Sequence, residues 1–387
     1  MPSLTRFLLF SLLLQWLALG LFRLIFWWIF RDPLDPIPPE TLAKALYLGA
    51  KFDLRLCLLV HLPLAALGWI PRLNPVRSAT GRRLWIGLLL AASLGLLMLY
   101  GTDLGHYAYL AARLDASSLR FLANPYESFG VLWESYPVVS GPAAACAAVA
   151  LYGWVLVRNS RRLAAVGPPP LFGPRRTVAI VATVLIFAGG IYGKLSYYPL
   201  RWSDAFFSTH EFASAVALNP VLYFFETFKN RDVDQNPDVV RDFYPEMAER
   251  LGVDAPDPDR LNFDRELVGR PGEGRPNVVI VLLESLAYYK TGFSGNPLDP
   301  SPNLDALAQE GVLFRRFYAP HGGTARAVFS SFTGLPDVEP NKTSTRNPLI
   351  VNQHTLFNSF VGYEKFYFLG GSASWANIRA LLKTNIP

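Results

Sequence analysis

Five long apolar runs in the first half of the chain constrain its fold more than any other feature. They cover residues 7–30, 42–70, 84–105, 136–157 and 177–193. A helix needs about 20 apolar residues to cross a hydrocarbon core of about 30 Å. The fifth run is short and the second carries charged residues, but both have the composition of membrane segments. We therefore predict a membrane domain with five transmembrane helices over residues 1–193.

The loops between these runs predict how the chain crosses the membrane. Residues 71–83 contain four arginines and no acidic residue, and residues 158–176 contain five arginines and no acidic residue. Loops rich in Lys and Arg stay on the cytoplasmic side. The pattern predicts a multi-pass protein with a cytoplasmic N-terminus and everything after residue 193 outside. It also explains the net charge of +6, so we expect no nucleic-acid partner.

Charged residues inside the second run need partners of their own. Lys51, Asp53 and Arg55 are unfavourable against lipid, so they should pair or face the interior of the helix bundle. An internal ion pair and a role beneath a lipid headgroup are both open at this point. Arg23 lies near the outer end of the first run, and we expect its side chain to snorkel toward the interface.

Residues 194–275 join the membrane domain to the C-terminal part of the chain. Residues 194–228 mix aromatic and polar positions, which is typical of amphipathic helices on a membrane surface. Helices packed on an external domain would show the same pattern, so both interpretations stand. Residues 229–275 are polar and rich in Pro, which predicts a linker.

Residues 276–387 have the pattern of an α/β domain. The apolar, β-branched run at 277–285 predicts a parallel strand covered on both faces. A helix should come after it, with Ser301 as N-cap, Pro302 at its first position and Gly311 at its end. A short strand at 314–319 and a helix ending at Gly334 come next, and strands that alternate with helices indicate an α/β sheet.

Two residues of this domain are candidates for chemistry. Glu284 closes the first predicted strand and Thr324 opens the helix that follows a later one, so both should lie at the edge where strands end. A hydroxyl at a helix N-terminus lies beside backbone N–H groups that stabilise an attached phosphate or sulfate. Gly322 and Gly323 let the backbone approach such an anion. The alternative is that Thr324 is a plain N-cap and Glu284 a solvated carboxylate.

Four segments of the sequence together resemble one family: "GAKFDLRL", "RPNVVIVLLESL", "PNLDALAQEGVLF" and "HGGTARAVFSSFTGLP". With them, the chain is similar to the lipoteichoic acid synthase and phosphoglycerol transferase branch of the sulfatase and alkaline phosphatase superfamily. The resemblance implies that Glu284 and Thr324 bind a divalent metal, Mn²⁺ or Mg²⁺ with Zn²⁺ as an alternative, and that Thr324 is the catalytic nucleophile.

The resemblance also implies a reaction. Family members are membrane-bound transferases of the bacterial cell (inner) membrane with an extracytoplasmic catalytic domain. They take phosphoglycerol from phosphatidylglycerol and pass it to an envelope polymer or glucan through a phosphothreonine. The segment "GGSASWANIRALL" resembles the part that supplies Trp375 and Arg379 to the glycerol phosphate pocket. Arg326 is either a phosphate contact or a solvated helix residue.

The sequence departs from the family pattern after residue 334. The family completes its metal site with an Asp–His pair and a later His, and no such pair follows Thr324. His321 is either a surface loop residue or lies beside the phosphate. We therefore expect an N-terminal portion of a longer enzyme, truncated within its sulfatase-like domain and inactive alone. Alternatives are a phosphoethanolamine transferase, a sulfatase-type hydrolase and a non-catalytic membrane fragment.

Overall fold

Two compact units make up the chain in the computed structural model. Met1–Arg231 and Pro320–Pro387 form the first unit, and Asp232–Ala319 form the second. Each is described by itself, and the domain boundaries predicted at residues 193 and 275 stay predictions. The residues that the structure describes are 2–123, 133, 139–166, 173–228, 236–266, 269, 274–338 and 343–386.

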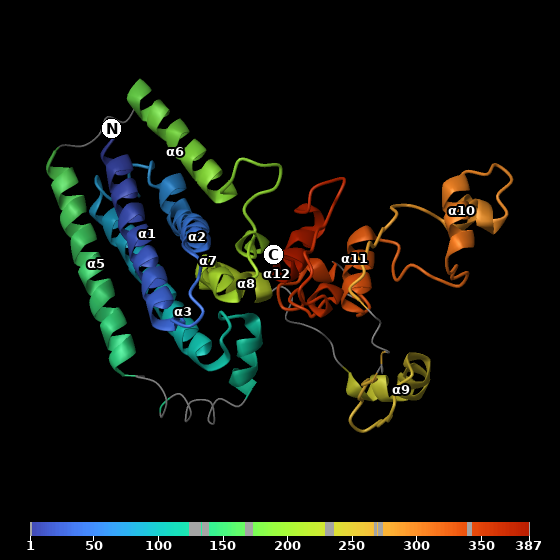
Figure 1. Ribbon diagram of the computed structural model, residues 1–387. Helices are drawn as coiled ribbons and strands as arrows, with labels where there is room; N and C mark the ends of the chain where they lie inside the picture. Colours follow the sequence, from blue (N-terminus) through green and yellow to red (C-terminus); the bar gives the residue numbers. More distant parts are fainter. Residues whose placement is uncertain are drawn as a thin grey trace. The chain divides into compact units, whose positions relative to one another are not determined.

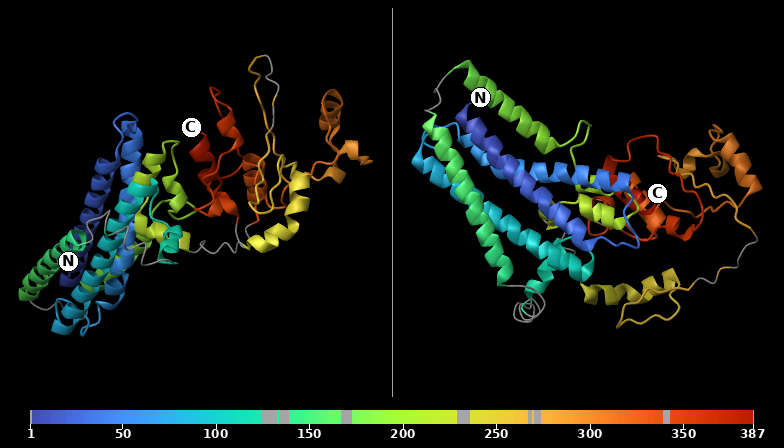
Figure 2. Two further views of the ribbon diagram at one scale, coloured as in Figure 1. Left: turned by 90° about the horizontal axis from the view of Figure 1, so that it is seen from below. Right: turned by 60° about the vertical axis from the view of Figure 1, so that its left-hand side comes forward.

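Long helices form the N-terminal part of the first unit (Figure 1). Among them, α1 packs on α2, α3 packs on α5, and α6 packs on α2. In both views of Figure 2, α1 and α2 run side by side. The five helices are α1 (Ser3–Phe30), α2 (Pro39–Leu67), α3 (Ala79–Leu110), α5 (Ser140–Ala165) and α6 (Pro174–Tyr192).

Four of the described helices, α1, α3, α5 and α6, are long and apolar enough to cross a membrane. In α1, leucines such as Leu13, Leu17 and Leu21 remain exposed, and a helix that is apolar on all sides is typical of a membrane span. Helix α2 is 29 residues long but does not qualify, because its most apolar stretch contains three charged residues, Lys51, Asp53 and Arg55. The prediction of five spans is therefore not confirmed.

Shorter elements complete the first unit around an apolar core. This core joins Phe26 of α1 and Phe52 of α2 to Val216, Phe329 and Leu381 from later in the chain. The elements are η1 (Ala116–Ala123), η2 (Trp202–Ala205), α7 (Glu211–Ala217), α8 (Pro220–Phe228), α11 (Thr324–Thr333), η5 (Ser344–Arg346), η6 (Leu356–Ser359), η7 (Trp375–Asn377) and α12 (Ile378–Asn385).

The segment 194–228 packs against protein. Ala213, Val216 and Ala217 of α7 are fully buried, and Trp202 is 8% exposed. Small side chains on α7 allow it to approach α2 closely, and η2 contacts α2 on one side and α12 on the other. Of the two interpretations of this segment, the structure therefore favours helices packed within the protein for α7 and η2.

The second unit contains α9 (Pro237–Leu251), two short 3-10 turns, η3 (Tyr288–Lys290) and η4 (Gly292–Ser294), and α10 (Pro302–Glu310). Tyr244 of α9 is 1% exposed. Its hydroxyl lies 2.6 Å from the Asn262 carbonyl oxygen and accepts from the Asp257 N–H at 2.9 Å. Helix α10 has Ser301 as N-cap, Pro302 first and Gly311 after its end, which confirms the prediction for this helix.

The predicted sheet is not present in the described residues, which contain no β-strand. Residues 277–283 have no regular structure, and Val279 and Val281 are 83% and 69% exposed. Residues 314–319 contain a turn instead of a strand. A strand bonds only to a neighbouring strand, whereas a helix bonds within itself. The α/β architecture stays a prediction.

Candidate active site

Thr324 is the first residue of α11, and Gly323 is the N-cap. The Gly323 carbonyl accepts from the Ala327 N–H at 2.9 Å, which is the first bond of the helix. Gly323 itself has extended backbone angles, as N-cap residues do. Thr324 therefore does not occupy the N-cap position, so capping of the helix does not explain why a threonine is at this position.

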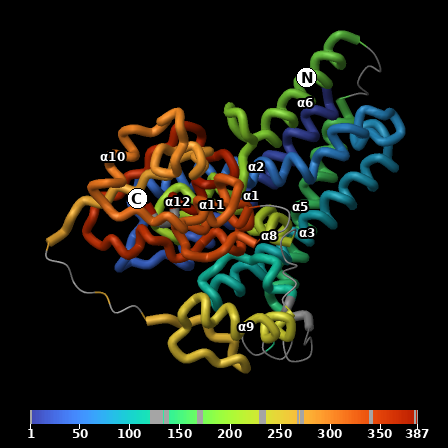
Figure 3. Tube along the Cα trace, turned by 90° about the vertical axis from the view of Figure 1, so that its right-hand side faces the viewer, coloured from blue at the N-terminus to red at the C-terminus, as the bar shows by residue number. Residues whose placement is uncertain are grey.

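The opposite face of α11 holds the helix in place. Ala325, Val328, Phe329 and Phe332 are buried in the core shared with α12. Figure 3 shows α11 and α12 close together. The helix ends at Gly334, whose φ of 73° is the left-handed conformation that glycine adopts most easily. Burial of one face leaves Thr324 and Arg326 partly exposed at the start of the helix.

His321 lies beside this helix start. Its Nδ1 accepts from the Gly323 N–H at 2.8 Å, and its Nε2 lies 3.5 Å from Nη1 of Arg326. A backbone N–H can only donate, so Nδ1 is the acceptor and Nε2 carries the proton. Two donor nitrogen atoms are therefore 3.5 Å apart, and an anionic oxygen that lies to one side of both could accept a hydrogen bond from each. This observation favours the placement of His321 beside a phosphate.

Glu284 belongs to the second unit and Thr324 to the first. The Glu284 side chain is exposed, and its Oε1 accepts from Oγ of Ser285 at 3.2 Å. Ser285 has a φ of 56°, a left-handed conformation that is uncommon for serine. Because each unit is described by itself, the meeting of Glu284 and Thr324 at one metal stays a prediction.

Metal ligands are few in the described residues. No group of three His, Cys, Asp or Glu side chains lies together among them in a way that could hold an ion. Protein sites for Mg²⁺, Ca²⁺ or Zn²⁺ take most of their ligands from such side chains. The carboxylate of Glu284 and the hydroxyl of Thr324 are oxygen ligands of the kind that a divalent cation takes, so a metal site that includes both stays a prediction.

Trp375 and Arg379 lie in the same unit as Thr324, around a strained turn. Trp375 is 45% exposed and Arg379 is exposed. Between them, Ala376 and Asn377 have φ values of 50° and 61°, which are unfavourable for residues with a side chain. Such strain often marks a functional site.

Two hydrogen bonds stabilise this turn. Thr345 Oγ1 donates to the Ala376 carbonyl at 2.6 Å, and Ser203 Oγ donates to Oδ1 of Asn377 at 2.8 Å. Sequence analysis did not identify Thr345 or Ser203, because no local pattern reports a bond between residues so far apart. Ser203 also connects the turn to the segment that follows α6.

Comparison with known proteins identifies a sulfatase-like segment in this chain. Residues 276–380 match the sulfatase family. The matched segment includes Glu284, Thr324, Arg326, Trp375 and Arg379. N-acetylgalactosamine-6-sulfatase of Mus musculus is 41% identical over 44 residues, which are 11% of this chain and 8% of the mouse protein. No solved structure matches.

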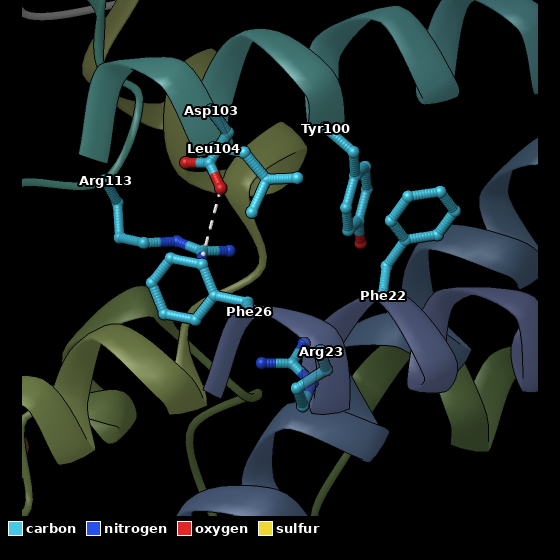
Figure 4. Close-up of a pocket in the computed structure, with 7 residues that line it drawn as sticks. All are labelled: Phe22, Arg23, Phe26, Tyr100, Asp103, Leu104 and Arg113. Carbon is cyan, nitrogen blue, oxygen red and sulfur yellow. Dashed lines mark ion pairs between the residues drawn. The ribbon is translucent and has the colours of Figure 1, made fainter. Parts of the chain in front are cut away.

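A buried charged network lies among the N-terminal helices of the first unit. Asp53 Oδ1 lies 2.6 Å from Nη2 of Arg23, and Asp103 Oδ2 lies 3.2 Å from Nη1 of Arg113. Figure 4 shows the second pair beside Phe26 and Tyr100. Arg23 is 6% exposed, so the prediction that it snorkels is wrong: its partner Asp53 lies on the adjacent helix, inside the bundle.

A cavity of about 10 Å³ separates Arg23 from Arg113 and Asp103. This volume is about that of one water molecule. The Arg113 Nε–H is buried and has no hydrogen-bond partner among the described residues. Burial lowers the pKa of the Arg113 guanidinium, while the charge of Asp103 raises it.

The same network fixes the junction of α7 and α8. Arg23 donates to the carbonyls of Val216 and Leu218. Asn219 donates to Asp53 Oδ1 and to the Tyr100 hydroxyl, both at 2.8 Å. The N-terminal helices α1, α2 and α3 thus hold α7 and α8 through buried polar contacts. Because α7 and α8 share an apolar core with α11 and α12, the helix that carries Thr324 is connected to these N-terminal helices.

Proposed function

We propose that this chain is part of a membrane-bound transferase. It would move a phosphoglycerol group from a phosphatidylglycerol-type lipid to an envelope polymer or glucan, in a bacterial inner membrane with the sulfatase-like domain outside. One observation carries the proposal. Thr324 opens α11 in the same compact unit as four helices of membrane length, and we expect a lipid headgroup to reach it there.

The proposed reaction has two steps. Thr324 Oγ attacks the phosphorus of the lipid, and the bond from phosphorus to the diacylglycerol oxygen breaks. The threonine hydroxyl loses its proton, and the departing diacylglycerol oxygen gains one. An acceptor hydroxyl then attacks the phosphothreonine, which forms the product and restores Thr324. A covalent intermediate divides one difficult displacement into two easier ones.

The residues around Thr324 suit the charge of this intermediate. The N-terminus of α11 favours negative charge through its backbone N–H groups. We expect His321 Nε2 and Arg326 Nη1 to donate hydrogen bonds to the phosphoryl oxygens, since these two nitrogen atoms lie 3.5 Å apart. We expect Arg379 to contact the phosphate and Trp375 to pack on the glycerol.

A divalent cation is part of the proposal, with Mn²⁺ or Mg²⁺ expected and Zn²⁺ as an alternative. Glu284 and Thr324 would be ligands, and the cation would lower the pKa of the threonine hydroxyl. Titration of Mn²⁺ into the full-length protein should show at least about tenfold weaker binding for Glu284→Gln. Glu310→Gln in α10 is the control. Equal Mn²⁺ affinity in all three proteins would exclude Glu284 as a ligand.

Removal of the nucleophile is the main test. In proteoliposomes, Thr324→Ala in the protein expressed from its full gene should reduce release of diacylglycerol from phosphatidylglycerol by about 10³-fold or more. Ser331→Ala lies on the exposed face of the same helix and should leave the rate unchanged. Undiminished release by Thr324→Ala would contradict the assignment of the nucleophile.

A sulfatase-type hydrolase is the second candidate, and the similarity to a mouse sulfatase favours it. The same proteoliposomes distinguish the candidates when the donor is varied. A transferase should release diacylglycerol rapidly when an acceptor alcohol is present, and only slowly, by hydrolysis, when the alcohol is absent. A hydrolase should cleave a soluble sulfate ester. Preference for phosphatidylethanolamine would point to phosphoethanolamine transfer, and inertness toward all donors to a non-catalytic fragment.

A further inference from the structure

The loop after α6 follows a helix of membrane length. Helix α6 has 19 residues and is therefore about 28 Å long, close to the thickness of a hydrocarbon core. Its last turns pack closely on α2, because a side chain at Gly190 would meet Leu58. Arg55 of α2 donates to the Leu200 carbonyl. The loop and Arg55 are thus at the same height along the helix bundle.

This loop, residues 193–201, presents apolar and aromatic side chains outward. It folds back on α6, since the Leu200 N–H donates to the Tyr192 carbonyl at 2.8 Å. The Tyr192 hydroxyl also lies 2.7 Å from the Tyr197 carbonyl. Leu195 is fully exposed, and Tyr197 is 88% exposed. An exposed Leu and Tyr directly after a membrane-length helix are typical of residues in the headgroup region.

Four cations lie in the loop or near it. Lys194 and Arg201 are at its two ends, Arg55 of α2 donates to the Leu200 carbonyl, and Lys51 is one helical turn before Arg55 on the same face of α2. We call them the boundary cluster. Asp204 binds Lys194 Nζ at 2.7 Å and the Arg201 N–H at 2.8 Å. Asp204 and Glu226 also attract the charge of Arg55. Two carboxylates against four cations leave the boundary cluster with a net positive charge.

Lys51 and Arg201 carry this excess. Lys51 Nζ lies 5.2 Å from the Tyr47 ring, and the Arg201 guanidinium lies 4.6 Å from the Tyr198 ring. Within the described residues, neither side chain has a carboxylate at ion-pair distance. A cation above a ring keeps N–H groups available for an anionic oxygen.

We propose that the boundary cluster binds the phosphate headgroup of an anionic membrane lipid. Lys51 and Arg201 contact the phosphate, while Leu195 and Tyr197 insert among the headgroups. Anionic lipids attract Lys and Arg close to the membrane surface, and apolar side chains beside them add burial. Lipid binding here depends on the position of the loop directly after a helix of membrane length and does not require transfer by Thr324.

The opposite ends of the helices are also basic, with arginines throughout 71–83 and 158–176, so the test must resolve the site. The full chain is placed in phosphatidylcholine nanodiscs with phosphatidylglycerol that carries a diazirine beside its phosphate. After irradiation, labelled peptides are identified by mass spectrometry. Labelling is expected in the peptide that contains residues 193–204.

Lys51→Gln with Arg201→Gln should reduce that labelling about fivefold for each cation removed, which is the attraction of one Lys or Arg to an anionic surface. Lys51→Arg should retain it. Arg161→Gln with Arg162→Gln, at the other end of the bundle, should leave the 193–204 label unchanged. Thr324→Ala should also leave it unchanged, which separates this site from the proposed chemistry.

Three results would overturn the proposal. The first is equal labelling of wild type and the Lys51→Gln, Arg201→Gln variant at residues 193–204. The second is equal labelling by a zwitterionic phosphatidylcholine probe with the same diazirine. The third is labelling confined to peptides at the opposite ends of the helices.

Discussion

The two units contain ion pairs with similar distances but very different surroundings. In the first unit, Arg23 and Asp53 lie 2.6 Å apart with side chains 5% and 0% exposed. In the second, Arg250 and Glu246 lie 2.9 Å apart and are 77% and 66% exposed. Water screens the exposed pair, whereas removal of one partner of a buried pair leaves an uncompensated charge. Burial therefore decides what each pair contributes.

Apolar residues differ between the units in the same way. Helix α1 satisfies its backbone hydrogen bonds within itself, so its leucines can face either protein or lipid. Residues 277–283 are as apolar but have no regular structure, and most of their side chains are exposed. The first unit thus holds buried charges in a defined network, while the second leaves its most apolar run outside any core.

The largest effect should follow from breaking the buried pair. Arg23→Met leaves Asp53 buried without its cation, and we expect it to lower the free energy of unfolding by about 3–5 kcal/mol. Unfolding in mixed detergent micelles, followed by circular dichroism, measures the loss. Arg23→Met with Asp53→Leu removes both charges and should lose less than Arg23→Met alone. A single variant as stable as wild type would show that the pair is hydrated.

An intermediate effect should come from the small buried centre of the second unit. Tyr244→Phe removes the hydroxyl that donates to the Asn262 carbonyl at 2.6 Å. The Asp257 N–H keeps its bond to Asn262 Oδ1 at 2.9 Å, so we expect a loss of about 0.5–1.5 kcal/mol, the net contribution of one hydrogen bond. Hydrogen exchange of the α9 amides should report this loss in their opening free energy. Tyr289→Phe, at a side chain 70% exposed, is the control. Equal exchange in both variants would contradict the burial of Tyr244.

The smallest effect should come from the exposed apolar run. Val281→Thr alters a side chain that is 69% exposed, so the free energy of unfolding of this chain should change by less than about 0.5 kcal/mol. Val328→Thr in α11, at a residue 5% exposed, should lose about 1–3 kcal/mol. A comparable loss from Val281→Thr would show that residues 277–283 form a buried strand in solution.

Local patterns predicted several elements correctly. The helix that begins at Thr324 and ends at Gly334 is present, and so is the helix introduced by Ser301 and Pro302. Caps, glycines and apolar periodicity act within one or two turns, so the sequence reports them directly. The expectation that Asp53 pairs inside the bundle is confirmed. Its partner, Arg23, is 30 residues earlier in the chain, on the neighbouring helix.

Other features depend on contacts that no local pattern records. The bonds from Ser203 to Asn377 and from Asn219 to Asp53 join residues on distant elements. The two donors at His321 and Arg326 became evident only from their distance of 3.5 Å. The Glu284 and Thr324 pairing and the α/β sheet stay predictions, because both need neighbouring strands in addition to the residues themselves.

By itself, the sequence determined the membrane-length helices, the start and end of α11, and the sulfatase-like residues at 276–380. These depend on hydrophobic length, helix capping and residue identity, which are properties of short segments. The tertiary structure alone decided that Arg23 is buried against Asp53 and that α7 and α8 pack on the membrane helices. The physical reason is desolvation: a charge leaves water only where the fold brings a partner to it.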